Sequence, residues 1–310
     1  ADAISHFLID RLLLGASPEH SPADHPLTLL EVLSKAAAEV ATSFRDRPET
    51  EAKIRSAIGQ AYHSLGDYPQ SVTHDHAAYE LLAAQPGAEE SDRLRALTQW
   101  GHGLVHLGRL DEAEPLLRKA HRETRDRLGV RHQTSQLAAE HLASLLSLQR
   151  RFGEAQTIYL QVLDAARAVK GPKDPFTLSI INNLAITYEK QGQLAEAERL
   201  FREASDVQLK ASGSGYSDTS LILGNLGGLI MRQGQLEEAE DLLRRSYESS
   251  RRTLGPQHPK TLIVMSKFGE VLCKRGRFDE AEGLLKLCLE AQQRIFAPNH
   301  EVVLATSKRL

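Results

Sequence analysis

Two histidines one helical turn apart are the residues whose spacing most suggests chemistry. His102 and His106 lie four residues apart in a stretch of helical periodicity, so both imidazoles fall on one side of a helix. Two imidazoles at this spacing can bind one metal ion, and His63 and His141 occupy comparable stretches of the adjoining helices. A zinc or nickel site needs a third close ligand, which the sequence does not locate. We therefore expect no metal or other cofactor, and only His102 and His106 are candidate ligands.

A second pattern is a series of basic residues that repeats every 42 residues. Its members are His106, Lys190, Arg232 and Lys274, with Leu148 interrupting the series. Each lies in the last turn of a predicted helix, where the helix dipole favours a cation whatever else the residue does. The alternative is that the series binds a ligand with acidic side chains or a free carboxylate. The sequence leaves both explanations open.

Catalytic motifs of the common enzyme classes do not occur in the sequence. It lacks G-x-G-x-x-G, H-R-D and D-F-G kinase elements, an H-E-x-x-H zinc helix and a G-x-S-x-G nucleophile elbow. Paired acidic residues such as Glu89 and Glu90, or Glu237 and Glu238, point in different directions and are interpreted as solvated charge. We predict that this chain is not an enzyme.

Composition narrows the class of protein further. The 310 residues carry 38 Lys and Arg against 41 Asp and Glu, a net charge of −3, so no basic excess favours nucleic acid. Two cysteines cannot form a disulfide scaffold, and no apolar stretch is long enough to span a bilayer. We expect a cytoplasmic chain that binds neither nucleic acid nor membrane. It would be extracytoplasmic if it belongs to a longer protein with an upstream membrane span.

The elements that position these residues follow from an internal repeat. Glycines at 66, 108, 192, 234 and 276 share the pattern G-x-[LYF]-x-x-[AS]-x and stand 42 or 84 residues apart, with Arg150 at the missing position. In the fourth unit, residues 175–191 have the spacing of an amphipathic helix that Asp174 caps and Gly192 ends. Residues 194–211 form a second helix. Small residues recur on the first helix of each unit and allow close crossing: Gly59, Gly101, Ala143, Ala185, Gly227 and Gly269.

This paired-helix unit resembles the tetratricopeptide repeat, and its 42-residue period is similar to the long-period subclass found in kinesin light chains. The resemblance implies an all-α, right-handed superhelical solenoid of antiparallel helix pairs. Six repeats are expected, at residues 52–93, 94–135, 136–177, 178–219, 220–261 and 262–303, and residues 304–310 would begin a truncated further repeat. The first repeat departs most from the pattern, because Ser71, Val72 and Asp75 replace its usual small and aromatic residues.

Residues 1–51 are expected to cap the array. Residues 26–44 have the pattern of an amphipathic helix, residues 3–14 that of a shorter one, and residues 15–24 that of the loop between them. This arrangement, with its Ser-Pro loop and T-x-x-E-V-L helix, resembles the segment that joins catalytic and repeat regions in large bacterial serine/threonine kinases.

In the tetratricopeptide family the first helix of each pair lines a concave groove. The resemblance implies that thirteen side chains of this sequence line it: Gln60, His63, Gln99, His102, His106, His141, Asn182, Asn183, Lys190, Asn225, Arg232, Lys267 and Lys274. Asn183 and Asn225 are 42 residues apart, and in related repeats such asparagines hydrogen-bond the backbone of a bound peptide. Gln99, His141 and Lys267 occupy the same position in other repeats.

We therefore predict a non-catalytic interaction module, the sensor or scaffold region of a larger bacterial protein, that binds an extended, acidic peptide or partner protein in the groove. One alternative is the regulatory region of a transmembrane serine/threonine kinase, and another is the sensor half of a transcription regulator. Self-association through exposed repeat ends is a further expectation.

Overall fold

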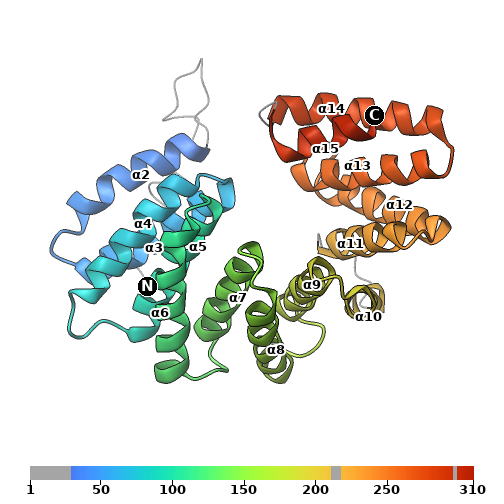
Figure 1. Cartoon of the computed structure of the whole chain (residues 1–310). Coiled ribbons are helices and arrows are strands. Elements are labelled where there is room, and N and C mark those ends of the chain that lie inside the picture. The colour runs from blue at the N-terminus through green and yellow to red at the C-terminus, as the bar shows by residue number, and fades with distance from the viewer. Residues whose placement is uncertain (1–28, 211–217, 296–298) are drawn as a thin grey trace, which may run out of the picture. The chain divides into compact units, whose positions relative to one another are not determined.

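The computed structural model describes residues 29–210, 218–295 and 299–310. Within these ranges it contains fourteen α-helices and no strand, which confirms the all-α class (Figure 1). The helices are α2 (Leu29–Ser43), α3 (Pro48–Leu65), α4 (Tyr68–Ala83), α5 (Glu90–His106), α6 (Leu110–Leu128), α7 (Gln133–Leu148), α8 (Phe152–Val169), α9 (Pro175–Lys190), α10 (Leu194–Lys210), α11 (Asp218–Arg232), α12 (Leu236–Thr253), α13 (Pro259–Lys274), α14 (Phe278–Ile295) and α15 (Glu301–Arg309). The predicted helix over 3–14 and the loop over 15–24 lie outside the described residues.

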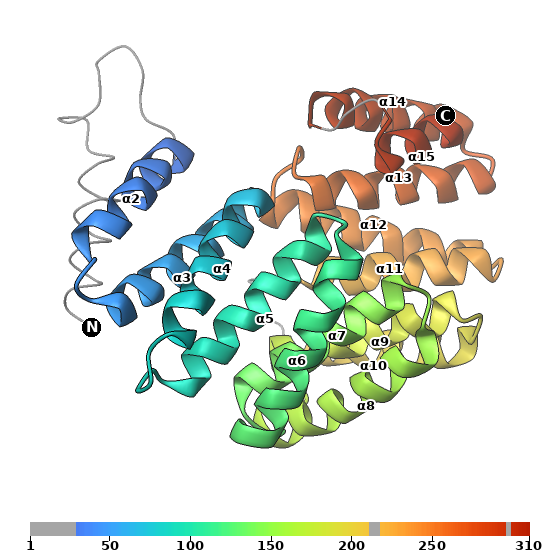
Figure 2. The same cartoon turned by 60° about the vertical axis from the view of Figure 1, so that its left-hand side comes forward.

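Backbone contacts divide the chain into two compact units, Ala1–Ile158 and Tyr159–Leu310, with the boundary inside α8. In the first unit each helix from α2 to α7 packs on the next, as Figure 2 shows for α3, α4 and α5. In the second unit the helices from α9 to α15 pack in the same sequential way. Both units are therefore continuous stacks of antiparallel helices. The right-handed superhelix of the whole array stays a prediction.

The first helices of successive pairs also contact one another. In the first unit α5 touches both α3 and α7, and in the second unit α9, α11, α13 and α15 touch in turn. The surfaces formed by these two sets are called the inner faces below. Their helices begin two to four residues before the repeat boundaries counted from the sequence.

Caps and turns follow the sequence prediction. Asp174 accepts a hydrogen bond from the Phe176 N–H at 2.9 Å and starts α9. Gly192, just after α9, has φ +84°, and the corresponding turn glycines share this left-handed conformation. Arg150 stands where the sequence has lost its glycine, yet it adopts φ +63°, the single positive value among the described non-glycine residues. The repeat geometry thus imposes the conformation even on an unfavourable residue.

Small residues allow the two helices of a pair to cross closely, as predicted. A Cβ atom added to Gly227 on α11 would lie 2.8 Å from Cγ of Leu243 on α12. The same substitution at Gly269 would bring a Cβ within 2.6 Å of Leu285, and Ala143 and Ala185 are fully buried. At Gly227 and Gly269 this close packing leaves no room for a methyl group.

The irregular first repeat folds all the same. Helix α4 begins at Tyr68, after Asp67 accepts a hydrogen bond from the Gln70 N–H at 3.3 Å. Inside the pair the Ser71 hydroxyl donates to the Asp75 carboxyl at 3.2 Å, and both side chains are buried. Gly59 on α3 leaves the space that this carboxyl occupies, since its added Cβ would lie 2.6 Å from Asp75 Oδ1.

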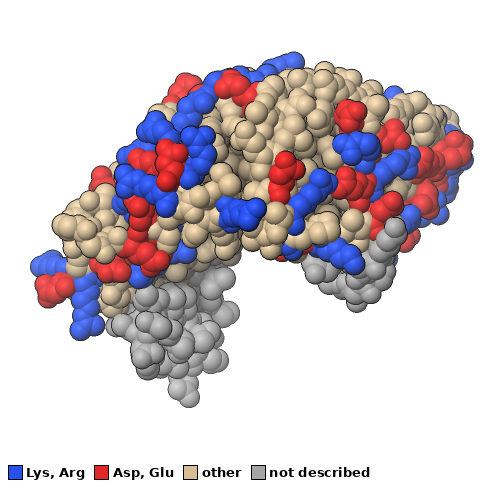
Figure 3. Space-filling view, turned by 90° about the horizontal axis from the view of Figure 1, so that it is seen from below, with Lys and Arg blue, Asp and Glu red and all other residues tan. Residues whose placement is uncertain are grey.

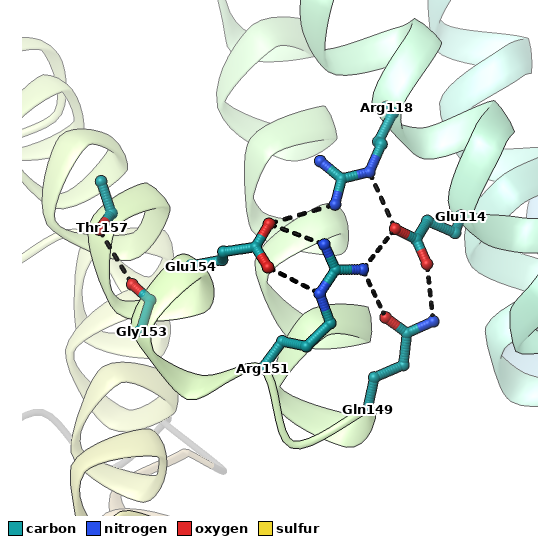
Figure 4. A network of polar contacts seen from close by, with 7 residues as sticks. All are labelled: Glu114, Arg118, Gln149, Arg151, Gly153, Glu154 and Thr157. Carbon is teal, nitrogen blue, oxygen red and sulfur yellow. Dashed lines mark hydrogen bonds and ion pairs between the residues drawn. The ribbon is translucent and has the colours of Figure 1, made fainter.

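Ion pairs join one second helix to the next on the opposite side of the stack. Glu114 on α6 accepts from Arg118 at 2.9 Å, from Arg151 at 2.6 Å and from Gln149 at 2.8 Å, and Arg151 also binds Glu154 on α8 (Figure 4). Hydrogen bonds from Gln149 and Arg151 lower the pKa of Glu114 to about 2. Glu198, Arg202, Gln233 and Glu238 repeat this network in the second unit. The network fixes each pair against its neighbour.

Candidate functional site

Three amides and one ammonium group form a continuous polar row on the inner face of the second unit. The Asn182 side-chain amide on α9 donates to Asn183 Oδ1 at 3.3 Å, and Asn225 on α11 donates to Asn182 Oδ1 at 3.0 Å. Lys267 Nζ on α13 then donates to Asn225 Oδ1 at 3.3 Å. The structure therefore brings together four of the predicted groove residues across three successive first helices. They bond to one another, so each amide retains only part of its hydrogen-bonding capacity for a ligand.

The hydrogen-bond acceptors around the Lys267 ammonium group are neutral. This group donates to Asn225 Oδ1 and, at 3.5 Å, to the Gly224 carbonyl, and no carboxylate among the described residues lies within ion-pair distance. Burial lowers the pKa of Lys267, and the charges of Arg232 and Arg309 act in the same direction, whereas those of Glu189 and Glu270 raise it. A half-buried ammonium without a counter-ion is unfavourable, and an external carboxylate would relieve that cost.

Two neighbouring hollows share Lys267 as a lining residue. One, of about 290 Å³, lies between α13 and α15 and is also lined by Ser266, Glu301 and Arg309. A smaller one, of about 40 Å³, lies between α11 and α13 and includes Asn225 and Ser220. Lys267 therefore lines a hollow on each side of α13.

The members of the basic series have different surroundings. Arg232 pairs with Glu189, and Lys274 lies 3.9 Å from Glu270. Lys190 is exposed, and the fourth member, His106, belongs to a histidine cluster. All four occupy the last turn of their helix, which fits the helix-dipole explanation. Acidic neighbours already balance two of them, so Lys267 is the stronger candidate for binding an anion.

Four histidine rings pack together on the inner face of the first unit. His102 Nε2 and His106 Nε2 are 3.2 Å apart, and His63 from α3 brings its ring within 4.9 Å of both, measured between centroids. His141 from α7 stacks on His102 with centroids 3.7 Å apart and planes 3° from parallel. His63 is therefore the third side chain close to His102 and His106, which the sequence did not locate.

The remaining predicted residues of the first unit do not join this cluster. Gln60 is exposed on α3, and Gln99 is half-buried on α5. The sequence analysis also missed two residues. Tyr68, at the aromatic position after the turn glycine, stacks on His106 with centroids 4.4 Å apart. Arg309 falls 42 residues after Lys267, and it donates to Glu270 at 2.6 Å and to the Ser266 hydroxyl at 2.9 Å. Both Tyr68 and Arg309 occupy periodic positions of the repeat, so the 42-residue period finds them once the positions that face the groove are known.

Charge is finely divided over the outer surface. On the face shown in Figure 3, Lys and Arg side chains lie beside Asp and Glu side chains at both sides of the view, with broad areas of other residues between them. The acidic pairs that the sequence analysis interpreted as solvated take part in this pattern, since Glu238 binds Arg202 at 2.7 Å and Glu237 binds Arg275 at 3.2 Å. No helix of the described ranges is long and apolar enough to cross a bilayer.

Comparison with known families identifies the repeat. The tetratricopeptide repeat family matches residues 134–210 and 218–294 through one of its descriptions and residues 94–119 through another, together more than half of the chain. The chain belongs to the tetratricopeptide repeat family. A search of curated proteins found no match.

Solved structures share the fold. Repeats of a putative kinesin light chain from Podosopora anserina are 23% identical, with a TM-score of 0.55, and the match covers 67% of this chain and 99% of that one. A Rap protein complexed with Competence and Sporulation Factor is 14% identical, with a TM-score of 0.61 and coverage of 98% and 82%. NprR in complex with its cognate peptide NprX is 12% identical, with a TM-score of 0.61 and coverage of 99% and 82%. At these identities the likeness concerns the fold.

Proposed function

We propose that this chain is a non-catalytic interaction module that binds an extended, acidic segment of a partner protein on the inner face of its second unit. The observation that carries the proposal is the row from Asn183 to Lys267, which ends in an ammonium group bonded to neutral acceptors. The amides offer donors and acceptors to a peptide backbone, and the ammonium group offers a partner to a carboxylate.

The arrangement of the polar row and the complexes of two proteins of similar fold both support this proposal. The row crosses three first helices, so its residues follow one another across the stack as the residues of an extended peptide would. Two structures of similar fold are complexes, one of a Rap protein with Competence and Sporulation Factor and one of NprR with its cognate peptide NprX. A ligand carboxylate at Lys267 would give the ammonium group a partner of opposite charge, where its present acceptors are neutral.

The experiment uses a library of unstructured peptides in which each acidic sequence has a twin with Gln for Glu and Asn for Asp. The immobilised full chain is expected to retain the acidic members and not their twins. Fluorescence anisotropy of the best member should then show affinity that falls with added salt. Lys267→Met should weaken binding at least tenfold, because it leaves the ligand carboxylate without its buried partner.

Lys274→Met is the matched control. Lys274 lies on the same helix, but it is exposed and neighbours Glu270, so its loss should change affinity by less than threefold. Asn225→Ala tests the amide row and should also weaken binding. Peptides that bind both Lys267→Met and Asn225→Ala as tightly as the parent chain would place the binding surface elsewhere.

The kinase and transcription-regulator alternatives differ from this proposal in the protein around the module rather than in its binding face. Sequence encoded upstream of Ala1 separates them. A G-x-G-x-x-G loop, an H-R-D element and an apolar span indicate the kinase, whereas a helix-turn-helix indicates the regulator.

A further inference from the structure

We propose that His63, His102 and His106 form a binding site for a divalent transition-metal ion of the zinc type on the inner face of the first unit. The three side chains come from α3 and α5, and one ring nitrogen from each lies within 4.8 Å of the other two. Imidazole nitrogen suits Zn²⁺, Ni²⁺, Cu²⁺ and Co²⁺, whereas Mg²⁺ and Ca²⁺ require oxygen ligands.

The spacing of the nitrogens is close to that of a tetrahedral site. With Zn–N bonds of about 2.1 Å, two ligand nitrogens of a tetrahedral zinc lie about 3.4 Å apart. His102 Nε2 and His106 Nε2 are 3.2 Å apart, so this pair already has the required separation. The third nitrogen, from His63, lies within 4.8 Å of the other two, and its ring packs beside both of theirs.

Neighbouring rings hold the ligands in place. His141 stacks on His102, and Tyr68 stacks on His106 with planes 8° from parallel. These contacts come from α7 and α4, so four helices of the first unit fix the orientation of the cluster. Metal sites gain affinity from such supporting contacts, because they restrict the ligand rotamers before the ion arrives.

Burial also favours the neutral form of the three imidazoles, which is the form that binds metal. Burial and, to a lesser extent, neighbouring imidazoles lower the pKa of His63, His102 and His106, although Glu140 opposes this for His106. His63 Nε2 is buried without a hydrogen-bond partner, an unusual state for a ring nitrogen and one that an ion would satisfy.

The arrangement resembles an open site more than a closed structural one. Three protein nitrogens leave a fourth position of a tetrahedral zinc for water or for a ligand atom. His106 is exposed, so an ion can enter from solvent. The site lies on the first unit and makes no use of Lys267, so it stands or falls independently of the proposed peptide surface.

Zn²⁺ itself is the probe. The tag-free full chain, treated with EDTA and dialysed, is titrated with Zn²⁺ in competition with a chromophoric chelator. One ion should bind per chain, and Co²⁺ at the same site should give the visible absorption of tetrahedral nitrogen coordination. His106→Gln and His63→Gln should each weaken Zn²⁺ binding at least tenfold and abolish the Co²⁺ spectrum.

His76→Gln is the matched control, because His76 lies in the same unit, stacks on Trp100 and pairs with Glu80 away from the cluster. Its Zn²⁺ affinity should equal that of the parent chain. Circular dichroism confirms that each variant is folded. Failure of the parent chain to bind Zn²⁺, or binding that His106→Gln and His63→Gln leave unchanged, overturns the proposal and leaves the rings as a packing cluster.

Discussion

Asp75 is a carboxyl group at a position where the other repeats bury a large apolar side chain. Its counterparts at 42-residue steps are Leu117, Tyr159, Phe201, Leu243 and Leu285, all of them buried. Asp75 is only 2% exposed, and its carboxyl accepts a hydrogen bond from the Ser71 hydroxyl. Burial raises the pKa of Asp75 to about 7, although the bond from Ser71 acts in the opposite direction. Between about pH 4 and about pH 7, the Asp75 carboxyl is therefore protonated in the folded chain and ionised in the unfolded chain.

Asp75→Asn should make the protein more stable at alkaline pH. The pKa of Asp75 is above its ordinary value of 3.8, so the parent chain loses stability as pH rises from about 4 to about 7 and then levels off. The amide cannot ionise and avoids this loss, which we expect to be roughly 1–3 kcal/mol at about pH 8. The measurement is the free energy of unfolding in urea at several pH values.

The quantity to compare is the difference in the free energy of unfolding between Asp75→Asn and the parent chain, because the contributions of the other titrating groups cancel in this difference. Asp67→Asn is the control; Asp67 caps α4 through Gln70, so its loss should shift stability by a similar amount at neutral and alkaline pH. A difference between Asp75→Asn and the parent that is the same from about pH 4 to about pH 8 would show that Asp75 does not titrate within that range.

Spacing found the residues, but not their partners. The step of four residues between His102 and His106 predicts that the two rings meet, and they do. The contribution of His63 depends on how closely α3 approaches α5, which no local pattern encodes. The 42-residue period places Asn183 and Asn225 at equivalent positions of neighbouring repeats. The hydrogen bonds that connect the two side chains, however, run through Asn182. The side chain next to a periodic residue is outside the periodic signal, and tertiary packing decides its role.

Helix pairs were the most predictable elements. Gly227 and Leu243 illustrate why, because close crossing requires a small residue on one helix and a large one on the other, and both leave a periodic trace. Charged residues leave a weaker trace. Arg202 and Glu238 are 36 residues apart, so their bond is visible only when two repeats are superposed. Glu238 is a part-exposed surface carboxylate, and it also joins α10 to α12 through Arg202.

Gly227→Ala should destabilise the α11 and α12 pair. The new methyl group would overlap Leu243, and overpacking of this kind costs about 1–3 kcal/mol. Gly283→Ala in α14 is the matched control, because a Cβ there meets no atom within 4 Å. This change should instead raise stability by about 0.5–1 kcal/mol through helix propensity. Thermal unfolding followed by circular dichroism compares the two. Equal shifts would mean that crossing distance does not limit residue 227.

At the scale of the whole molecule, stability comes mainly from contacts between helices and repeats that are adjacent along the chain. From α2 to α7 and from α9 to α15 each helix packs mainly on the next along the chain, and the ion-pair networks also join adjacent repeats. A repeat array of this kind has nearest-neighbour energetics, so a local defect spreads only as far as the coupling between pairs allows. The division into two compact units indicates where that coupling changes. Self-association through the repeat ends remains a prediction, which sedimentation of the full chain tests.

The packing therefore predicts that damage stays within the unit that carries it. Hydrogen exchange in Gly227→Ala should accelerate in α11 and α12 and spread to α10 and α13, while α5 and α6 keep the protection of the parent chain. Gly101→Ala, which overlaps Leu117 in the first unit, should give the reciprocal pattern and leave α13 unchanged. If either variant instead loses protection evenly from α3 to α14, the chain unfolds as one cooperative body. The nearest-neighbour description would then be wrong, because strain at one crossing would be felt at all of them.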